Sequence, residues 1–282
     1  MSNNQRSGDD STNFQANRDI TVNYPATIVM YSFEEMAKHL QLSVFGGLPD
    51  ETKKQSAMNQ QSYSQVLSGN LNKIIKQGAE LKKVIDSIDF QYIAKKAGIS
   101  AIRSSSIELQ KSLSLLIVQR INNDDEELRR IVFNEAIETI DKLTVNQQKQ
   151  LALCLLMTRV TIDSLTDIKK FIEFIEKKVL PLLDYNESAV DLMHLTYTGC
   201  VSKSSFSMEL DSLLTRKYPH IFYGDITAKK KLADNEVWKK LRKVWSTTQI
   251  KHMDLTPVGI VIAVTFLEQI TGIKINIDSY FD

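Results

Sequence analysis

The chain carries a thiol, an imidazole and a carboxylate close together in sequence, at Cys200, His194 and Asp191. A cysteine nucleophile needs these groups, because its thiol must lie within hydrogen-bonding distance of a base that accepts its proton. The short separation in sequence neither requires nor forbids such contact. The alternative is structural, since Gly199 followed by Cys200 is typical of a helix C-terminal turn and a small buried residue. We favour the structural interpretation and predict no catalytic residues.

The candidate metal ligands lack metal-binding spacing. The histidines are scattered singly along the chain, at His39, His194, His220 and His252. The acidic run over residues 124–127 has groups that bind cations, but negative charge in a first helical turn also stabilises the helix dipole, and we favour this second explanation. The sequence contains no glycine-rich phosphate loop, HExxH or GxSxG pattern. We therefore predict a protein that is not an enzyme and that has no metal or cofactor.

The charge balance excludes a molecule that is basic or acidic as a whole. Lys and Arg together number 35 and Asp and Glu 34, so binding to an anionic partner would have to be local. The two cysteines are too few for a disulfide framework and are typical of a reducing compartment. The most apolar segment, residues 258–267, is half of the about 20 residues that span a membrane. We expect a cytoplasmic protein without a membrane partner.

One segment breaks this balance. Over residues 229–243 the basic side chains outnumber Asp234 and Glu236, which leaves a local excess of about five positive charges. The basic positions are Lys229, Lys230, Lys231, Lys239, Lys240, Arg242 and Lys243. On a helical wheel Val237, Leu241 and Trp245 share the opposite face, as in a core-anchored helix with a cationic outer surface. This surface either binds phosphate or an acidic protein, or is a solvated face without a partner.

An alternating pattern near the N-terminus predicts a β strand or short hairpin. Over residues 13–24, apolar side chains fall mostly at even positions and polar side chains at odd positions, which is the period of a strand. The apolar positions that we expect to self-associate are Phe14, Ile20, Val22 and Tyr24. Because an isolated strand pair is marginal in water, this face docks either on the helical core or on another copy. The Asn and Gln side chains of the other face favour assembly, since amides form ladders when identical strands stack.

The rest of the chain has mainly helical periodicity. One amphipathic helix is predicted over residues 71–88 by the three- and four-residue spacing of Leu71, Ile74, Ile75, Gly78, Leu81, Ile85 and Ile88. Ser32 with Glu35 has the spacing of a capping box for a helix over residues 33–42, and Thr144 with Gln147 has the same spacing for a second helix. The last fifth of the chain reads as helix, strand, helix, strand, with the final strand at Ile273, Ile275 and Ile277.

These patterns together predict a mainly α fold. We expect a multi-helix bundle with a short N-terminal β strand or hairpin and a small C-terminal α+β appendage, for which a winged-helix-like arrangement is one form. The predicted domains are a polar tail with the strand or hairpin over residues 1–25, a helical body over 26–220 and the helix-strand-helix-strand unit over 221–282.

The run GDDSTNFQANRDITV near the N-terminus resembles a signature, GD-x-ST-N-x-Q-A, of a family of uncharacterised bacterial proteins. The stretches FNEAIETIDKLTVNQQKQLALCLL, LLDYNESAVDLMHLTYTGC and LTPVGIVIA are similar to the helical body of the same family. Asp10 stands where the signature has Asn. Similar GD-x-ST tails occur on bacterial phage-defence proteins, so the resemblance implies a role in such a system, and it carries over no catalytic residues.

The leading expectation is therefore a bacterial interaction or regulatory protein of the cytoplasm that self-assembles through its N-terminal strand, in a homo-oligomer or with another protein. The alternative is a nucleic-acid-binding module that uses the basic helix. A third reading is an enzyme with an unfamiliar site.

Overall fold

The computed structural model describes residues 46–281 apart from 186, 187, 189, 208 and 223–225, together with residues 29, 34, 35 and 38. The predicted N-terminal strand or hairpin, and with it Phe14, Ile20, Val22 and Tyr24, lies outside the described residues. Of the helix expected over residues 33–42, Glu34, Glu35 and Lys38 are described and are helical. Within the described part of the chain the fold is mainly α with a small α+β portion, as predicted.

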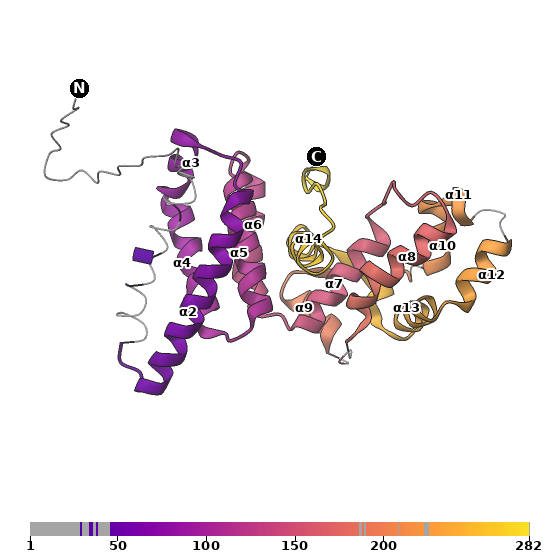
Figure 1. The fold of residues 1–282 in the computed structure, drawn as a ribbon, viewed down its shortest axis with the longest axis horizontal. Coiled ribbons are helices and arrows are strands. Elements are labelled where there is room, and N and C mark those ends of the chain that lie inside the picture. The colour runs from indigo at the N-terminus through magenta and orange to yellow at the C-terminus, as the bar shows by residue number, and fades with distance from the viewer. Residues whose placement is uncertain are drawn as a thin grey trace, which may run out of the picture.

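The first half of the described chain is a bundle of helices, drawn in indigo and magenta in Figure 1. Its elements are α2 (Asp50–Asn70), the short η1 (Leu71–Lys73), α3 (Gly78–Ile85), α4 (Ile88–Arg103), α5 (Ile107–Asn122) and α6 (Glu127–Ile140). α2 packs against α4 and α5, and α6 packs against α5 and α4. Ser87 and Ser106 begin α4 and α5, because each side chain accepts a hydrogen bond from a backbone N–H in the first turn.

The single helix predicted over residues 71–88 is wrong. The chain forms η1, then an extended stretch through Gln77, and only then α3, whose first residue Gly78 has a φ of 56°. Such a positive φ suits glycine alone at little cost. Of the apolar positions that gave this pattern, Leu71, Leu81 and Ile85 are buried, but Ile75 and Ile88 are exposed. Periodicity therefore identified part of the buried face and missed the break in the backbone.

The second half begins with α7 (Val145–Thr158), which has the predicted capping box of Thr144 and Gln147. It continues through α8 (Ile168–Phe174), a π-helical turn η2 (Ile175–Val179), η3 (Leu180–Leu183) and α9 (Asp191–Tyr197). Five further short helices follow: α10 (Leu210–Lys217), α11 (Pro219–Phe222), α12 (Ile226–Asp234), α13 (Glu236–Thr247) and η4 (Gln249–His252). In Figure 1, α12 and α13 lie at the end of the molecule opposite α2.

A two-stranded antiparallel sheet joins two distant segments. β1 (Val201–Lys203) pairs with β2 (Met253–Leu255), with Val201 opposite Leu255. The expected strand at Ile273, Ile275 and Ile277 is not formed. This stretch has no regular secondary structure and leads into η5 (Asp278–Tyr280). Its alternating isoleucines instead pack against the core, with Ile277 buried.

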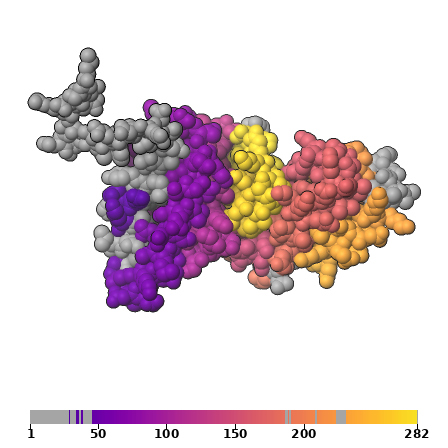
Figure 2. All heavy atoms as spheres, viewed as in Figure 1, coloured from indigo at the N-terminus to yellow at the C-terminus, as the bar shows by residue number. Residues whose placement is uncertain are grey.

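The helix α14 (Pro257–Thr271) occupies the middle of the molecule. It packs against α5 and α6 of the first half and against α7 of the second, and Figure 1 shows it in yellow between the two groups. The space-filling view in Figure 2 shows the same yellow surface between indigo and magenta on one side and salmon on the other. The C-terminal segment thus shares its core with the helical body, and the boundary near residue 220 stays a prediction.

Across the described residues, no helix has both the length and the apolar character that crossing a bilayer requires.

Candidate functional site

The structure brings two of the three groups of the catalytic candidate to a shared neighbour and leaves Cys200 outside their hydrogen bonds. Asp191 is buried and its carboxylate accepts hydrogen bonds from the side-chain amides of Gln147 (3.0 Å) and Gln150 (2.9 Å) and from the Ser188 backbone N–H (2.7 Å). His194 Nδ1 lies 3.0 Å from Gln147 Nε2. Asp191 and His194 therefore meet around Gln147, at the contact between α7 and α9.

Cys200 takes no part in this cluster. Its Sγ lies 3.5 Å from the Thr198 hydroxyl, and burial raises the pKa of the thiol. Cys154 is buried inside α7, and burial raises its pKa to about 12. A thiol with a raised pKa supplies little thiolate, which is the nucleophilic form. The structural interpretation of the Gly199–Cys200 turn agrees with these contacts.

The segment around Cys200 instead contacts the start of α14. The Cys200 carbonyl accepts a hydrogen bond from the Thr256 backbone N–H (3.1 Å), and the Thr256 hydroxyl donates to the Gly199 carbonyl (2.6 Å). A Cβ on Gly259 would lie 1.9 Å from the Cys200 carbonyl oxygen, so only glycine allows this approach.

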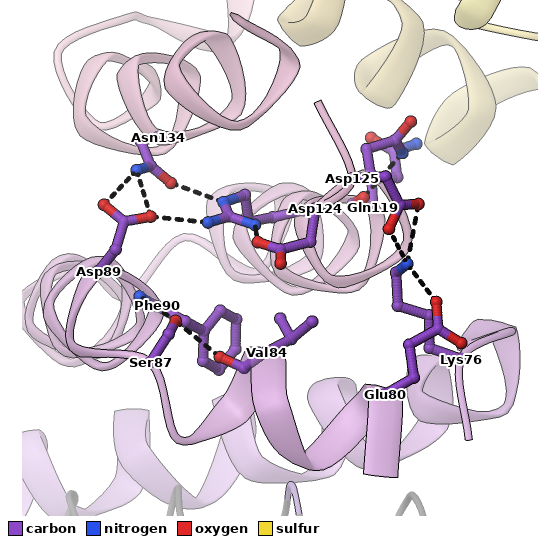
Figure 3. Close-up of polar contacts among 12 residues, drawn as sticks. Lys76, Glu80, Val84, Ser87, Asp89, Phe90, Gln119, Asp124, Asp125 and Asn134 are labelled. Carbon is purple, nitrogen blue, oxygen red and sulfur yellow. Dashed lines mark hydrogen bonds and ion pairs between the residues drawn. The ribbon is translucent and has the colours of Figure 1, made fainter. Parts of the chain in front are cut away.

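The most connected polar cluster is built on Arg120, whose side chain is fully buried. Arg120 donates from Nε to Asn134 Oδ1 (2.8 Å), from Nη1 to Asp124 (2.5 Å) and from Nη2 to Asp89 (2.7 Å). Asn134 in turn donates to Asp89 (3.0 Å), as Figure 3 shows. These hydrogen bonds connect α4, α5 and α6 through the Arg120 side chain. This satisfies the requirement that a buried charge be paired and hydrogen-bonded.

The neighbouring carboxylates of the acidic run also have basic partners. Asp125 accepts from the buried Lys76 amine (2.7 Å), which also pairs with Glu80, and Figure 3 shows both contacts. Glu126 lies 3.1 Å from Arg129. Residues 124–126 therefore each pair with a cation of the chain, and among the described residues no group of His, Cys, Asp and Glu side chains could hold a metal ion.

A cavity of about 390 Å³ lies beside Asp125 and Glu126, between the α5–α6 turn, α14 and the C-terminal tail. Its polar lining comes mainly from amides and carboxylates, and its apolar lining from Val264 and isoleucines. The charged groups of the lining are paired, since Arg129 contacts both Glu126 and Asp278 (2.8 Å). Sequence reasoning missed the cavity and the Arg120 cluster, because their members come from segments that only the tertiary structure brings together.

The basic segment has the arrangement that the helical wheel predicted. In α13 the side chains of Trp238, Leu241 and Trp245 are buried, and the basic side chains are exposed on the other side. We name the exposed cations of α12 and α13 the basic surface: Lys230, Lys231, Lys239, Lys240, Arg242 and Lys243. The side chain of Lys229 lies outside the described residues. α12 and α13 pack against each other, so the two sets of cations belong to neighbouring helices.

Two members of the basic surface have acidic neighbours. Lys239 pairs with Glu236 (2.7 Å), whose hydrogen bond raises the lysine pKa, and Arg242 pairs with Asp211 of α10 (3.4 Å). All four of these side chains are more than half exposed. Exposed ion pairs contribute little to stability, so another anion can replace the carboxylate. Lys230, Lys231, Lys240 and Lys243 have no ion pair among the described residues.

Comparison with known proteins gives one match. The model of an uncharacterised protein family matches residues 54–233 and 225–281, which together cover most of the chain. No curated protein and no solved structure matches.

Proposed function

The chain belongs to this uncharacterised family, and we propose that it acts by binding an anionic macromolecule through the basic surface rather than by catalysis. The observation that carries the proposal is the exposure of six cations on α12 and α13, while the rest of the chain leaves the net charge at +1. Cations concentrated on two neighbouring helices of a nearly neutral protein attract an anionic partner to that region.

The burial of one face of α13 supports this proposal. Trp238, Leu241 and Trp245 bury the apolar face of the helix in the core, and the Asn235 side chain accepts a hydrogen bond from the Trp238 backbone N–H at its start. The basic side chains therefore project from a helix whose position is fixed by packing. A fixed array loses less conformational entropy on binding than the same charges on a mobile tail.

Retention on an immobilised polyanion tests this proposal. Wild-type protein should bind immobilised heparin at low salt and elute as the salt concentration rises, because exposed charges are screened. Lys240→Glu with Lys243→Glu should elute at clearly lower salt. The matched control is Lys82→Glu with Lys83→Glu in α3, which makes the same change in net charge at exposed positions elsewhere. Equal elution of the two double variants would mean that net charge, and not the basic surface, causes retention.

A second proposal concerns self-assembly, which we infer from the N-terminal sequence. In this proposal Phe14, Ile20, Val22 and Tyr24 form the apolar face of a strand that pairs with another copy, in a cytoplasmic bacterial protein that acts in phage defence. Its support is the alternating pattern of residues 13–24 and the GD-x-ST resemblance. Apolar side chains on a short polar segment need a partner surface, because the segment cannot form a core of its own.

Light scattering tests the second proposal. Deletion of residues 1–24 should lower the molar mass of the particle and leave the helical circular dichroism unchanged. Ile20→Lys with Val22→Lys should do the same, since charge on a strand edge blocks pairing. Equal mass for all three proteins would refute assembly through the strand. Loss of helicity on deletion would show instead that the strand docks on its own core.

A further inference from the structure

We propose that the partner of the basic surface is the phosphate backbone of a double-stranded nucleic acid, bound without base stacking and without sequence selection. This inference rests on the proposed function and names its partner.

Among its described residues, the basic surface lacks the apolar anchor that a protein partner would need. Interfaces between proteins have an apolar core, and a few buried aromatic or aliphatic side chains supply most of the affinity. The large exposed apolar side chains of the described chain end at Phe206, and the described residues from 209 onward contribute none. Charge alone seldom holds two proteins together, whereas a phosphate backbone binds mainly through charge. The surface therefore favours a nucleic acid over an acidic protein.

The aromatic residues of α13 distinguish a duplex from a single strand. Proteins that bind single strands stack successive bases on exposed aromatic rings. The two tryptophans of the chain, Trp238 and Trp245, both belong to α13, but both are buried on its core side. The bases of a duplex stay stacked on each other, so a duplex needs no aromatic contact. The described part of the basic surface, which offers cations and no exposed aromatic ring, thus matches the outside of a double helix.

The length of α13 is sufficient for contact with several phosphates of a duplex. α13 is 12 residues long, which corresponds to about 18 Å at 1.5 Å per residue. Duplex DNA carries a phosphate charge about every 1.7 Å of its axis, so several phosphates lie within this length. Lys240 and Lys243 lie on one face of α13, and α12 adds Lys230 and Lys231. If these four lysines each neutralise a phosphate, the slope of log affinity against log salt is about −3 to −4.

Fluorescence anisotropy of the full-length chain tests this inference with four probes: a labelled mixed-sequence DNA duplex, an RNA duplex, single-stranded oligo-dT of the same length, and labelled polyglutamate. We expect both duplexes to bind with the salt slope given above and oligo-dT and polyglutamate to bind at least about tenfold more weakly. Changing the duplex sequence should not change the affinity. Tighter binding of one duplex than of the other would identify the biological source without changing the inference.

The variants and an intrinsic signal make the test specific. Lys240→Gln with Lys243→Gln should weaken duplex binding by about tenfold and lower the salt slope by about 2, because each lost phosphate contact changes it by about 0.9. Lys82→Gln with Lys83→Gln is the matched control and should bind as wild type does. Tryptophan fluorescence should stay unquenched on binding, because both rings remain in the core.

The possible failures are distinguishable. If polyglutamate binds as tightly as the duplexes or more tightly, the nucleic-acid inference is overturned while the proposed anionic partner stands. Oligo-dT binding equal to duplex binding, or quenching of tryptophan, would overturn the assignment to a duplex. If no probe binds at low salt, both the inference and the proposed function are wrong. Loss of binding in the control variant alone would place the contact on another surface.

Discussion

At the scale of single residues, the buried cations have the clearest physical role. Arg120 is fully buried and donates to side chains of α4, the α5–α6 turn and α6. A buried guanidinium is costly unless its donors are satisfied, so these hydrogen bonds fix both the side chain and the helices that carry its partners. Asp89 is the partner on α4, and its titration reports on the cluster. Burial acts to raise the pKa of this carboxyl, but hydrogen bonds from Asn134 and Arg120 outweigh that effect and lower it.

We expect the stability contributed by Asp89 to depend on pH. Its folded pKa is lower than the unfolded value of about 3.9, so its contribution is present above about pH 4 and is lost as pH falls through the folded pKa. Asp89→Asn should therefore lower the urea midpoint at pH 7 and lower it much less at pH 3.

The matched control for this measurement is Asp86→Asn, at an exposed position a few residues before Asp89. It should leave the midpoint nearly unchanged at both pH values, since surface substitutions usually alter stability by less than about 0.5 kcal/mol. A loss of midpoint for Asp89→Asn that is as large at pH 3 as at pH 7 would show that packing, not charge, is what the substitution removes.

At the scale of elements, the start of α14 shows how one close contact joins distant segments. Thr256 caps α14 by accepting from the Gly259 backbone N–H, and its own N–H and hydroxyl donate to the carbonyls of Cys200 and Gly199. The pairing of β1 with β2 extends this contact along both segments. Residues 198–200 and 255–259, which are far apart in the chain, are therefore side by side.

Gly259→Ala should destabilise the protein by roughly 3 kcal/mol or more. The added Cβ would lie 1.9 Å from a backbone oxygen, which cannot move aside as a flexible side chain does. Thermal unfolding followed by circular dichroism measures the effect. Gly69→Ala in α2 is the control, because a Cβ there meets nothing within 4 Å and alanine stabilises a helix interior by up to about 1 kcal/mol. Similar midpoints for the two variants would contradict the close approach.

At the scale of the whole molecule, α14 connects the two halves. Its residues Ile260, Val261, Ile262 and Phe266 are buried, and it contacts α5, α6 and α7. A helix that is apolar on nearly all sides belongs in the middle of a core. The last residues of the chain thus supply core to helices that precede them by more than a hundred positions.

Expression of residues 26–220 alone should therefore fail to give a stable domain. Without α14, apolar faces of α5, α6 and α7 would be exposed to water, at a cost of about 25 cal/mol for each Å². We expect a truncated protein that is rapidly cleaved by protease and lacks a cooperative thermal transition, whereas the full chain unfolds cooperatively. A stable, cooperatively folded fragment would show that the predicted boundary near residue 220 separates independent domains.

Local sequence pattern predicted most of the helices of the described chain and the buried face of α13. The capping box of Thr144 and Gln147 and the two faces of α13 were both predicted, because each depends on residues within one or two helical turns. The break before α3 was missed. Glycine permits the positive φ of Gly78, at which the backbone changes direction, and a continuous apolar pattern gives no sign of it. The alternation of Ile273, Ile275 and Ile277 predicted a strand, but in the described part of the chain β2 pairs with β1 and no strand pairs with residues 273–277. The meeting of Arg120, Asp89 and Asn134 and the position of α14 could not be predicted, because these contacts join residues far apart in the chain and depend on packing rather than on local pattern.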